Sequence, residues 1–234
     1  MFWTIPFFIT GGVPFILVLI ALFQKIEWRG EIKRHARAQF QNNSWAKFAL
    51  IYAGIWIVMA IVSNLISFIP LLNVLLNMAV TGLVGYGSVD VLRKIRRGED
   101  FTIRDFFPTD ELGSVMALTF VKDIYLFLWS LLFVIPGIIK GYSYSQVYYI
   151  ANENPGMSVD DIITESREMM DGHKWELFIL QVSFIGWGIL AALTLGLVGL
   201  YILPLYSMSL YLFHEYVKKG YLQSSTHKNV YTIY

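Results

Sequence analysis

Cysteine is absent from this 234-residue chain, and charged residues are scarce. Without a thiol, disulfides, thiolate metal sites and cysteine nucleophiles are excluded. Asp, Glu, Lys and Arg make up 15% of the residues, whereas a soluble domain carries about 25%. The net charge of +1 gives no global field that would favour nucleic acid. Because 56% of the residues are hydrophobic, the composition also excludes intrinsic disorder.

Catalytic and cofactor motifs are also missing from the sequence. It contains no G-x-S-x-G nucleophile elbow, no G-x-x-x-x-G-K-[ST] phosphate loop and no H-E-x-x-H zinc motif. The four histidines do not have metal-ligand spacing. We therefore expect a protein that is not an enzyme and that has no cofactor or metal. The less favoured alternative is an intramembrane hydrolase without a motif, built on Asp123 or His214.

What the sequence does contain is long runs without a charged side chain. The run 48–89 has 42 residues, which as one helix would measure roughly 63 Å against a hydrocarbon core of about 30 Å. It must therefore hold two spans, with a turn near Pro70. The whole pattern predicts about seven membrane spans, at 4–23, 47–69, 71–90, 114–135, 137–152, 176–195 and 197–216. The fifth is the weakest because it is short and contains Lys140.

The basic residues predict the orientation of these spans. Seven spans place the loops 24–47, 91–113 and 153–175 and the C-terminal tail on one side, and these segments hold 16 of the 18 basic residues. The positive-inside tendency makes that side the cytoplasm, with the N-terminus outside and the C-terminus inside. A cleaved signal peptide is the alternative for the first span, but that segment lacks a basic region before its apolar run.

Two further segments have the pattern of amphipathic cytoplasmic helices. In 26–43, apolar residues recur every four positions between cations, which is typical of a helix on an anionic membrane surface. In 158–170, Ser158 is placed to cap a helix that has Met169 and Met170 on its apolar face. The predicted fold is therefore an all-α, polytopic transmembrane bundle with an extra first span (1–24), a membrane domain (25–217) and a cytoplasmic tail (218–234).

Ionisable and polar residues at membrane depth are candidates for function, because leaving them in lipid costs several kcal/mol. One hypothesis is a proton or substrate path, or a set of ligand contacts, formed by Asp123, Lys140, Tyr144, His214 and Glu215. The alternative is that these side chains are interface anchors and buried pairs, and we favour it for the charged members.

Two segments carry a resemblance to a known family. They are 135–145 (IPGIIKGYSYS) and 166–178 (SREMMDGHKWELF). With Asn154-Pro155 between them, they resemble the bacterial membrane family called domain of unknown function 975, over roughly Glu27 to Val217. The motif positions are Pro136, Gly137, Ser166, Arg167, Gly172, His173, Lys174, Trp175 and Glu176. The family is common in Gram-positive bacteria and has no assigned activity, so the resemblance implies location and fold but no catalytic residue. Members typically begin near the basic helix, so 1–24 looks like an addition.

The sequence thus favours a multi-pass protein of the bacterial cytoplasmic membrane. The leading functional hypothesis is a non-enzymatic, transporter-like or accessory component for a small hydrophobic, peptide or lipid ligand. The alternative is an interaction protein that regulates or protects a partner, such as a peptide-immunity factor. We expect contacts with membrane lipids, and a membrane protein partner or a second copy of the chain is a further option. A polar cavity open to one side would favour the first hypothesis, and an exposed Met169/Met170 face the second.

Overall fold

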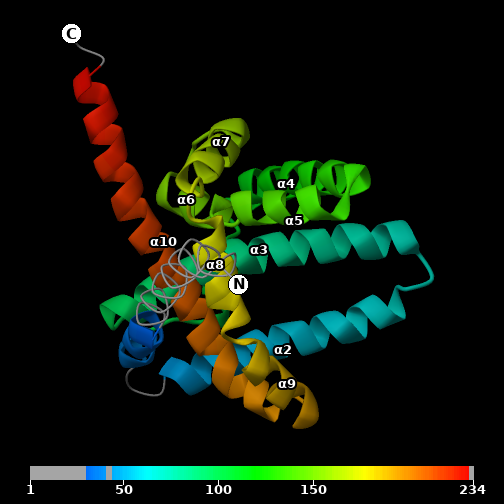
Figure 1. The fold of residues 1–234 in the computed structure, drawn as a ribbon. Helices are drawn as coiled ribbons and strands as arrows, with labels where there is room; N and C mark the ends of the chain where they lie inside the picture. The colour runs from blue at the N-terminus through cyan, green and yellow to red at the C-terminus, as the bar shows by residue number, and fades with distance from the viewer. Residues whose placement is uncertain (1–29, 41–43, 232–234) are drawn as a thin grey trace, which may run out of the picture.

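The computed structural model of the chain describes residues 30–40 and 44–231, and every regular element in these ranges is helical (Figure 1). A helical segment covers 30–39. The helices that follow are α2 Ser44–Leu65, α3 Pro70–Arg97, η1 Ile103–Phe106, α4 Leu112–Leu132, α5 Val134–Ser143, α6 Val147–Glu153, α7 Val159–Met169, α8 Lys174–Val182, α9 Ile185–Leu193 and α10 Leu197–Tyr231. The predicted all-α class is confirmed. The predicted span 4–23 lies outside the described residues.

Five helical stretches in the described part of the chain are long and apolar enough to cross a membrane. They are Ser44–Leu65, Pro70–Arg97, Leu112–Leu131, Lys174–Leu193 and Leu197–Gly220. Each overlaps one of the predicted spans. The stretch Lys174–Leu193 is not one regular helix, since α8 and α9 are separated by a turn at Ser183 and Phe184. The last helix, α10, continues to Tyr231, so no helix end marks the predicted boundary at 218.

The predicted fifth span, 137–152, is wrong as a continuous helix. The chain turns at Phe133, where the backbone is extended, and α5 starts at the next residue. Pro136 and Gly137 therefore lie in the first turn of α5 and do not form the turn itself. Proline is tolerated there because the N–H groups of a first helical turn have no partner within the helix. After ten residues α5 ends, and the seven-residue α6 follows at Val147.

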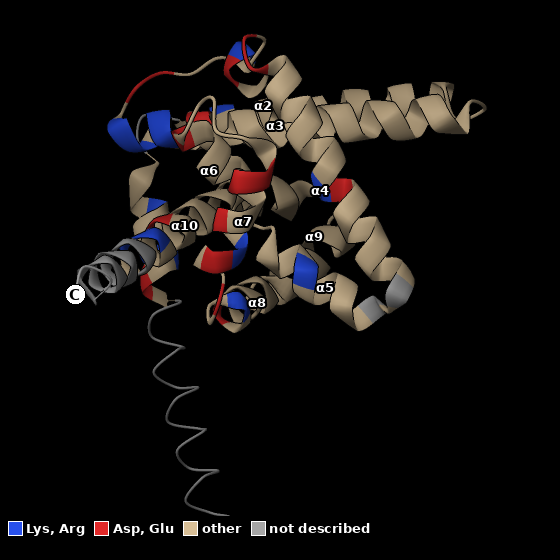
Figure 2. Cartoon of the chain, turned by 90° about the horizontal axis from the view of Figure 1, so that it is seen from above, with Lys and Arg blue, Asp and Glu red and all other residues tan. Residues whose placement is uncertain are grey.

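Charged side chains gather at one end of the molecule, which we call the charged end (Figure 2). Four ion pairs link helix ends and loops there: Lys47–Asp100, Arg96–Glu215, Lys94–Asp105 and Lys218–Glu153. The pairs bring together the start of α2, the ends of α3 and α6, and the middle of α10. Because α5 leads from the far end of α4 back toward α6, the pair α5–α6 returns the chain to the charged end (Figures 1 and 2).

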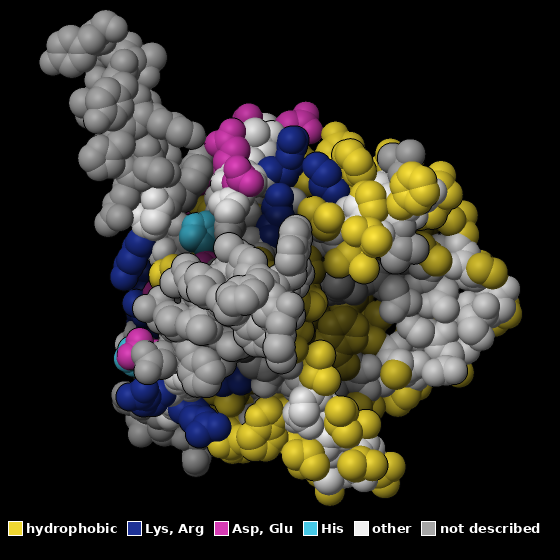
Figure 3. All heavy atoms as spheres, viewed as in Figure 1, with side chains coloured by type: hydrophobic (Ala, Val, Ile, Leu, Met, Phe, Trp, Pro, Cys, Tyr) yellow, Lys and Arg dark blue, Asp and Glu magenta, His cyan; other side chains and the backbone are white. Residues whose placement is uncertain are grey.

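Large apolar side chains are exposed over the rest of the molecule. Phe68, in the turn between α2 and α3, is 78% exposed, Leu131 at the end of α4 is 73% exposed, and Leu195 before α10 is 97% exposed. In Figure 3 the apolar side chains spread over the side away from the charges. Exposed apolar surface of this extent marks an interaction with lipid or protein. The buried core, which includes Phe48 and Phe213, lies toward the charged end.

Local sequence explains where α7 begins and ends. Ser158 is the N-cap, and its hydroxyl accepts a hydrogen bond from the Asp161 N–H at 3.2 Å and donates one to the Asp161 carboxylate at 2.6 Å. Past the other end, Gly172 has a φ of +80°, a left-handed conformation that glycine adopts without strain. The helix predicted from the Ser158 cap is therefore present.

The helical segment 30–39 buries the apolar residues Ile32 and Ala36 and exposes Arg34 and Arg37. Lys33 donates a hydrogen bond to the Ser183 carbonyl at 3.1 Å and lies 4.1 Å from the centre of the Phe184 ring. The segment is thus tied to the turn between α8 and α9.

Candidate functional site

The break between α5 and α6 is held by a serine of α7. The Ser166 hydroxyl donates to the Ser143 carbonyl at 2.8 Å and accepts from the Gln146 N–H at 3.3 Å. Both backbone groups lie at the interrupted part of the helical ladder, where an α-helix would otherwise satisfy them. Ser166 is fully buried, so water cannot take over these bonds. One hydroxyl therefore satisfies two backbone groups and fixes the position of α6.

His214 of α10 lies beside α6 and is fully buried. Its Nδ1 is 3.0 Å from the Gln146 Oε1, and its Nε2 is 3.4 Å from the Glu153 Oε2. The Tyr149 ring stacks on the imidazole with the ring centres 4.7 Å apart. Lys218 approaches the same Glu153 oxygen at 2.7 Å. The carboxylate of Glu153 therefore joins α6 to α10 through His214 and Lys218.

The Glu153 carboxylate is held by donors from α10. The Gln146 Oε1 accepts hydrogen bonds only, so His214 Nδ1 is the donor in that pair. Burial tends to raise the pKa of Glu153, but hydrogen bonds from His214 and Lys218 outweigh it and lower that pKa from 4.5 to about 2. Glu153 is therefore ionised at neutral pH.

A cavity of about 280 Å³, which we call the central cavity, lies between α2, α3, α6, α8 and α10. Its walls combine tyrosine rings and aliphatic side chains with hydroxyl and amide groups. The polar lining residues are Tyr52, Ser88, Ser145, Gln146, Tyr148, Tyr149, Gln181, Tyr206 and Ser207. Four of its five walls come from stretches long enough to cross a membrane. Mostly apolar cavities with a few placed polar groups are typical ligand sites.

Asp123, the first of the predicted path residues, forms an ion pair on α4. Its carboxylate is 3.1 Å from the ammonium group of Lys122. Lys122 also donates to the Tyr148 hydroxyl at 2.9 Å, and that hydroxyl is 3.2 Å from the Thr119 hydroxyl. The charged pair is thus bound to α6 through Tyr148, whose ring lines the central cavity.

The remaining predicted residues lie in other places. The Lys140 ammonium is 4.5 Å from the centre of the Trp129 ring, and the Tyr144 ring lies 6.4 Å from that of Tyr125. Glu215 is paired with Arg96 at the charged end. None of the five path residues lines the central cavity. The structure therefore distributes them over separate pairs and does not join them into one path.

The positions of the sequence motif have structural roles. Gly137 is buried against α4, where an added Cβ would lie 3.0 Å from the Ser130 Cα. At the start of α8, His173 and Glu176 interact at 2.8 Å. The exposed Trp175 stacks on Phe178 with the ring centres 5.0 Å apart. The other motif positions are Pro136, Ser166 and Gly172, described above, the exposed Arg167, and the half-buried Lys174.

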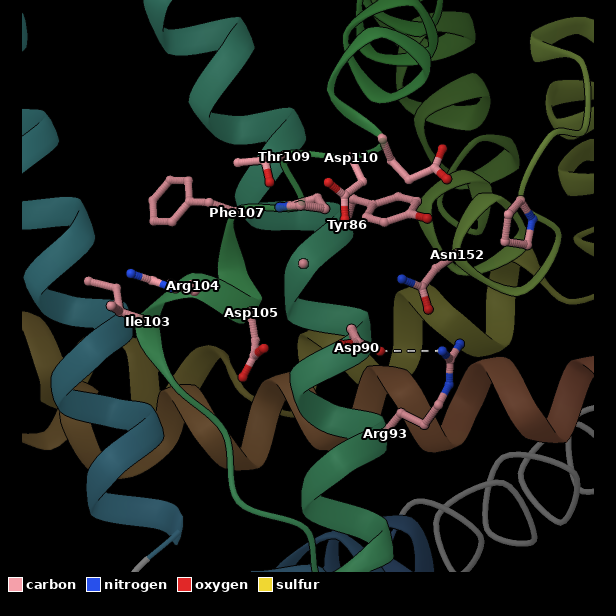
Figure 4. Close-up of a pocket in the computed structure, with 14 residues that line it drawn as sticks. Tyr86, Asp90, Arg93, Ile103, Arg104, Asp105, Phe107, Thr109, Asp110 and Asn152 are labelled. Atoms are coloured by element: carbon pink, nitrogen blue, oxygen red, sulfur yellow. Dashed lines mark ion pairs between the residues drawn. The ribbon is translucent and has the colours of Figure 1, made fainter.

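A larger pocket of about 830 Å³ opens on the surface between α3, η1 and the end of α6, and we call it the surface pocket (Figure 4). Asp90 and Arg93 form an ion pair of 3.5 Å on its wall. Burial tends to raise the pKa of Asp105, but hydrogen bonds from Lys94 and the Thr102 N–H outweigh it and lower that pKa. Its lining mixes acidic and basic side chains, so no single ligand charge is favoured.

The methionine face of α7 is not exposed. Met169 and Met170 are both buried in the core, together with Ile162 and Ile163. An exposed Met169/Met170 surface was the feature that would have favoured a partner-binding protein. This face of α7 instead packs into the hydrophobic core.

Sequence reasoning missed the central cavity and the role of Ser166. Gln146, Gln181 and Tyr149 were not among the predicted site residues, and Ser166 was only a motif position. A usable signal was the density of tyrosines from 142 to 149 together with two serines and a glutamine, which is unusual for a lipid-facing helix.

Together, these features define an all-helical protein with several helices suited to a membrane and a polar cavity between them. The family described as "Protein of unknown function (DUF975)" matches residues 131–220, which confirms the resemblance based on the two motifs. The match covers α5 to the candidate span of α10 and begins later than Glu27, where the resemblance was expected to start. No curated protein and no solved structure matches the chain.

Proposed function

We propose that this protein is a non-enzymatic, transporter-like or accessory membrane component that binds a small ligand in the central cavity. The observation that carries the proposal is the polar lining of a cavity of about 280 Å³ between stretches suited to cross a membrane. Polar side chains inside the hydrocarbon core of a membrane cost free energy unless they bind a ligand or another polar group. The residues lining the cavity offer hydroxyl, amide and aromatic groups, which are suited to binding.

The proposed orientation places the charged end in the cytoplasm. Support comes from the basic residues gathered there and from the apolar surface that covers the other end (Figures 2 and 3). In this arrangement α5 and α6 together form a crossing made of two pieces. Non-helical backbone at membrane depth is tolerated where protein buries it, and Ser166 provides that environment for the break.

Cysteine accessibility tests the proposal, because the chain has no cysteine of its own. Ser207 lines the central cavity, whereas Ser209, two residues further along α10, is fully buried outside its lining. A thiol reacts with methanethiosulfonates as the thiolate, which requires contact with water. We expect Ser207→Cys to react with methyl methanethiosulfonate, a small uncharged reagent, in membrane vesicles and the control Ser209→Cys to stay unmodified. An unreactive Ser207→Cys in a folded protein would refute a cavity open to solutes.

A further inference from the structure

We propose that the ligand of the central cavity is an uncharged molecule whose oxygen atoms accept hydrogen bonds from the hydroxyls of Tyr52, Tyr149 and Ser207. This inference rests on the proposed function and adds the chemical class of the ligand. The three hydroxyl groups come from α2, α6 and α10, on three walls of one cavity.

The first argument is that these hydroxyls have no protein partner. Among the residues that the structure describes, none of the three makes a hydrogen bond with another residue. Other polar groups of the lining are occupied, since Gln181 accepts from Tyr142 at 3.0 Å and Gln146 accepts from His214. A hydroxyl without a partner in an apolar setting is unfavourable, so the three groups are available to bind acceptor atoms.

The second argument concerns charge. Among the described residues, the lining of the central cavity includes no Asp, Glu, Lys, Arg or His. Lys122, which contacts the lining residue Tyr148, is already paired with Asp123. A charged ligand would lose its hydration on entry and would meet no opposite charge in exchange. The cavity therefore selects against ions and against peptides with free termini.

The third argument is size and shape. A volume of about 280 Å³ lies just below the range of roughly 300–1,000 Å³ that is typical of small-molecule sites. Tyrosine rings from α2, α6 and α10 form flat walls beside aliphatic groups such as Leu203 and Leu210. The space suits a neutral ring system with carbonyl oxygens, or the neutral headgroup of a lipid whose chains remain in the bilayer. Both sources present the same chemistry, namely oxygen acceptors without charge.

The test uses the variant Ser88→Cys as a reporter, since Ser88 lines the cavity but already bonds its own helix through the Val84 carbonyl. The variant is reconstituted in nanodiscs, and its reaction rate with methyl methanethiosulfonate, which is uncharged, is measured with two matched pairs of probes. The first pair is methyl 2-naphthoate and 2-naphthoate, and the second is dihexanoylglycerol and dihexanoyl phosphatidic acid. We expect at least one neutral member to slow labelling several-fold at saturation while its charged partner has no effect. Protection by the naphthoate ester alone indicates a small solute, and protection by the glyceride alone indicates a lipid.

A second variant tests the hydroxyls themselves. Tyr149→Phe in the reporter background should weaken the protecting probe about tenfold, as expected for one lost hydrogen bond. Tyr211→Phe is the matched control, because Tyr211 is buried beside Tyr149 but does not line the cavity. Equal protection by charged and neutral probes, no protection by any probe, or equal effects of the two Tyr→Phe changes would overturn the inference. If Ser88→Cys and Ser207→Cys do not react at all, the proposed function fails instead.

Discussion

Replacing Ser166 by alanine should destabilise the protein far more than the loss of one hydroxyl group suggests. The hydroxyl pairs the Ser143 carbonyl and the Gln146 N–H at the break between α5 and α6, and it is fully buried. Each buried polar group left without a partner costs about 1–3 kcal/mol. With two such groups, we expect the free energy of unfolding to fall by about 2–6 kcal/mol.

Ser209→Ala is the matched control for this experiment. Ser209 is equally buried, but its hydroxyl bonds the Leu205 carbonyl, which lies within the same continuous helix. Its loss should cost less than about 1 kcal/mol, because no backbone group is left unpaired. The assay is equilibrium unfolding by dodecyl sulfate in mixed micelles, followed by circular dichroism. Equal losses for Ser166→Ala and Ser209→Ala would refute the account of the break given above.

Three further predictions concern pH, helix packing and topology. The pKa of Glu153 is lowered from 4.5 to about 2, so its ionised form stabilises the fold above pH 4.5, and this stabilisation is lost as the pH falls toward 2. We expect the free energy of unfolding to fall by about 1–2 kcal/mol over this range after solvent screening. Unfolding measured at several pH values tests this, and Glu153→Gln should show no such loss. Gly137→Ala should lower stability by about 1–3 kcal/mol because its Cβ would clash with Ser130 of α4. Gly141→Ala, with nothing within 4 Å of the new Cβ, should be neutral or stabilising in the same assay. The reverse order would contradict the packing described. In intact cells, a membrane-impermeant maleimide should label Phe68→Cys and not Ser158→Cys, and labelling of Ser158→Cys from outside would invert the proposed orientation.

Much of the architecture could be predicted from the distribution of charge alone. The charge-free runs located four of the five stretches long enough to cross a membrane, because a span is predominantly apolar. The fifth, Leu112–Leu131, contains Lys122 and Asp123 and was predicted from the overall hydrophobic pattern. The cap at Ser158 and the stop at Gly172 were also predictable, since both depend on local chemistry. The break at 144–146 was not, because hydropathy records only the average character of a segment, and α5 and α6 are both apolar enough to be read as one helix.

The site could be predicted only in part. His214 was selected as a polar residue in a span, and it does lie in a polar cluster. Its partners Gln146 and Glu153 are more than sixty residues away in sequence, so their pairing depends on how α6 packs against α10. The partner of Asp123 is the adjacent Lys122, and Tyr148 links this ion pair to α6.

The break between α5 and α6 also bears on the order in which the chain assembles. An isolated seven-residue helix is unstable in water because it forms too few hydrogen bonds to offset the cost of nucleation, so α6 depends on its neighbours. Its backbone partner, Ser166, is synthesised thirteen residues after the end of α6. Segment 134–153 therefore cannot reach its final conformation as it leaves the ribosome. It requires α7 and then His214 of α10, so α5 and α6 reach their final arrangement only after that part of α10 has been synthesised.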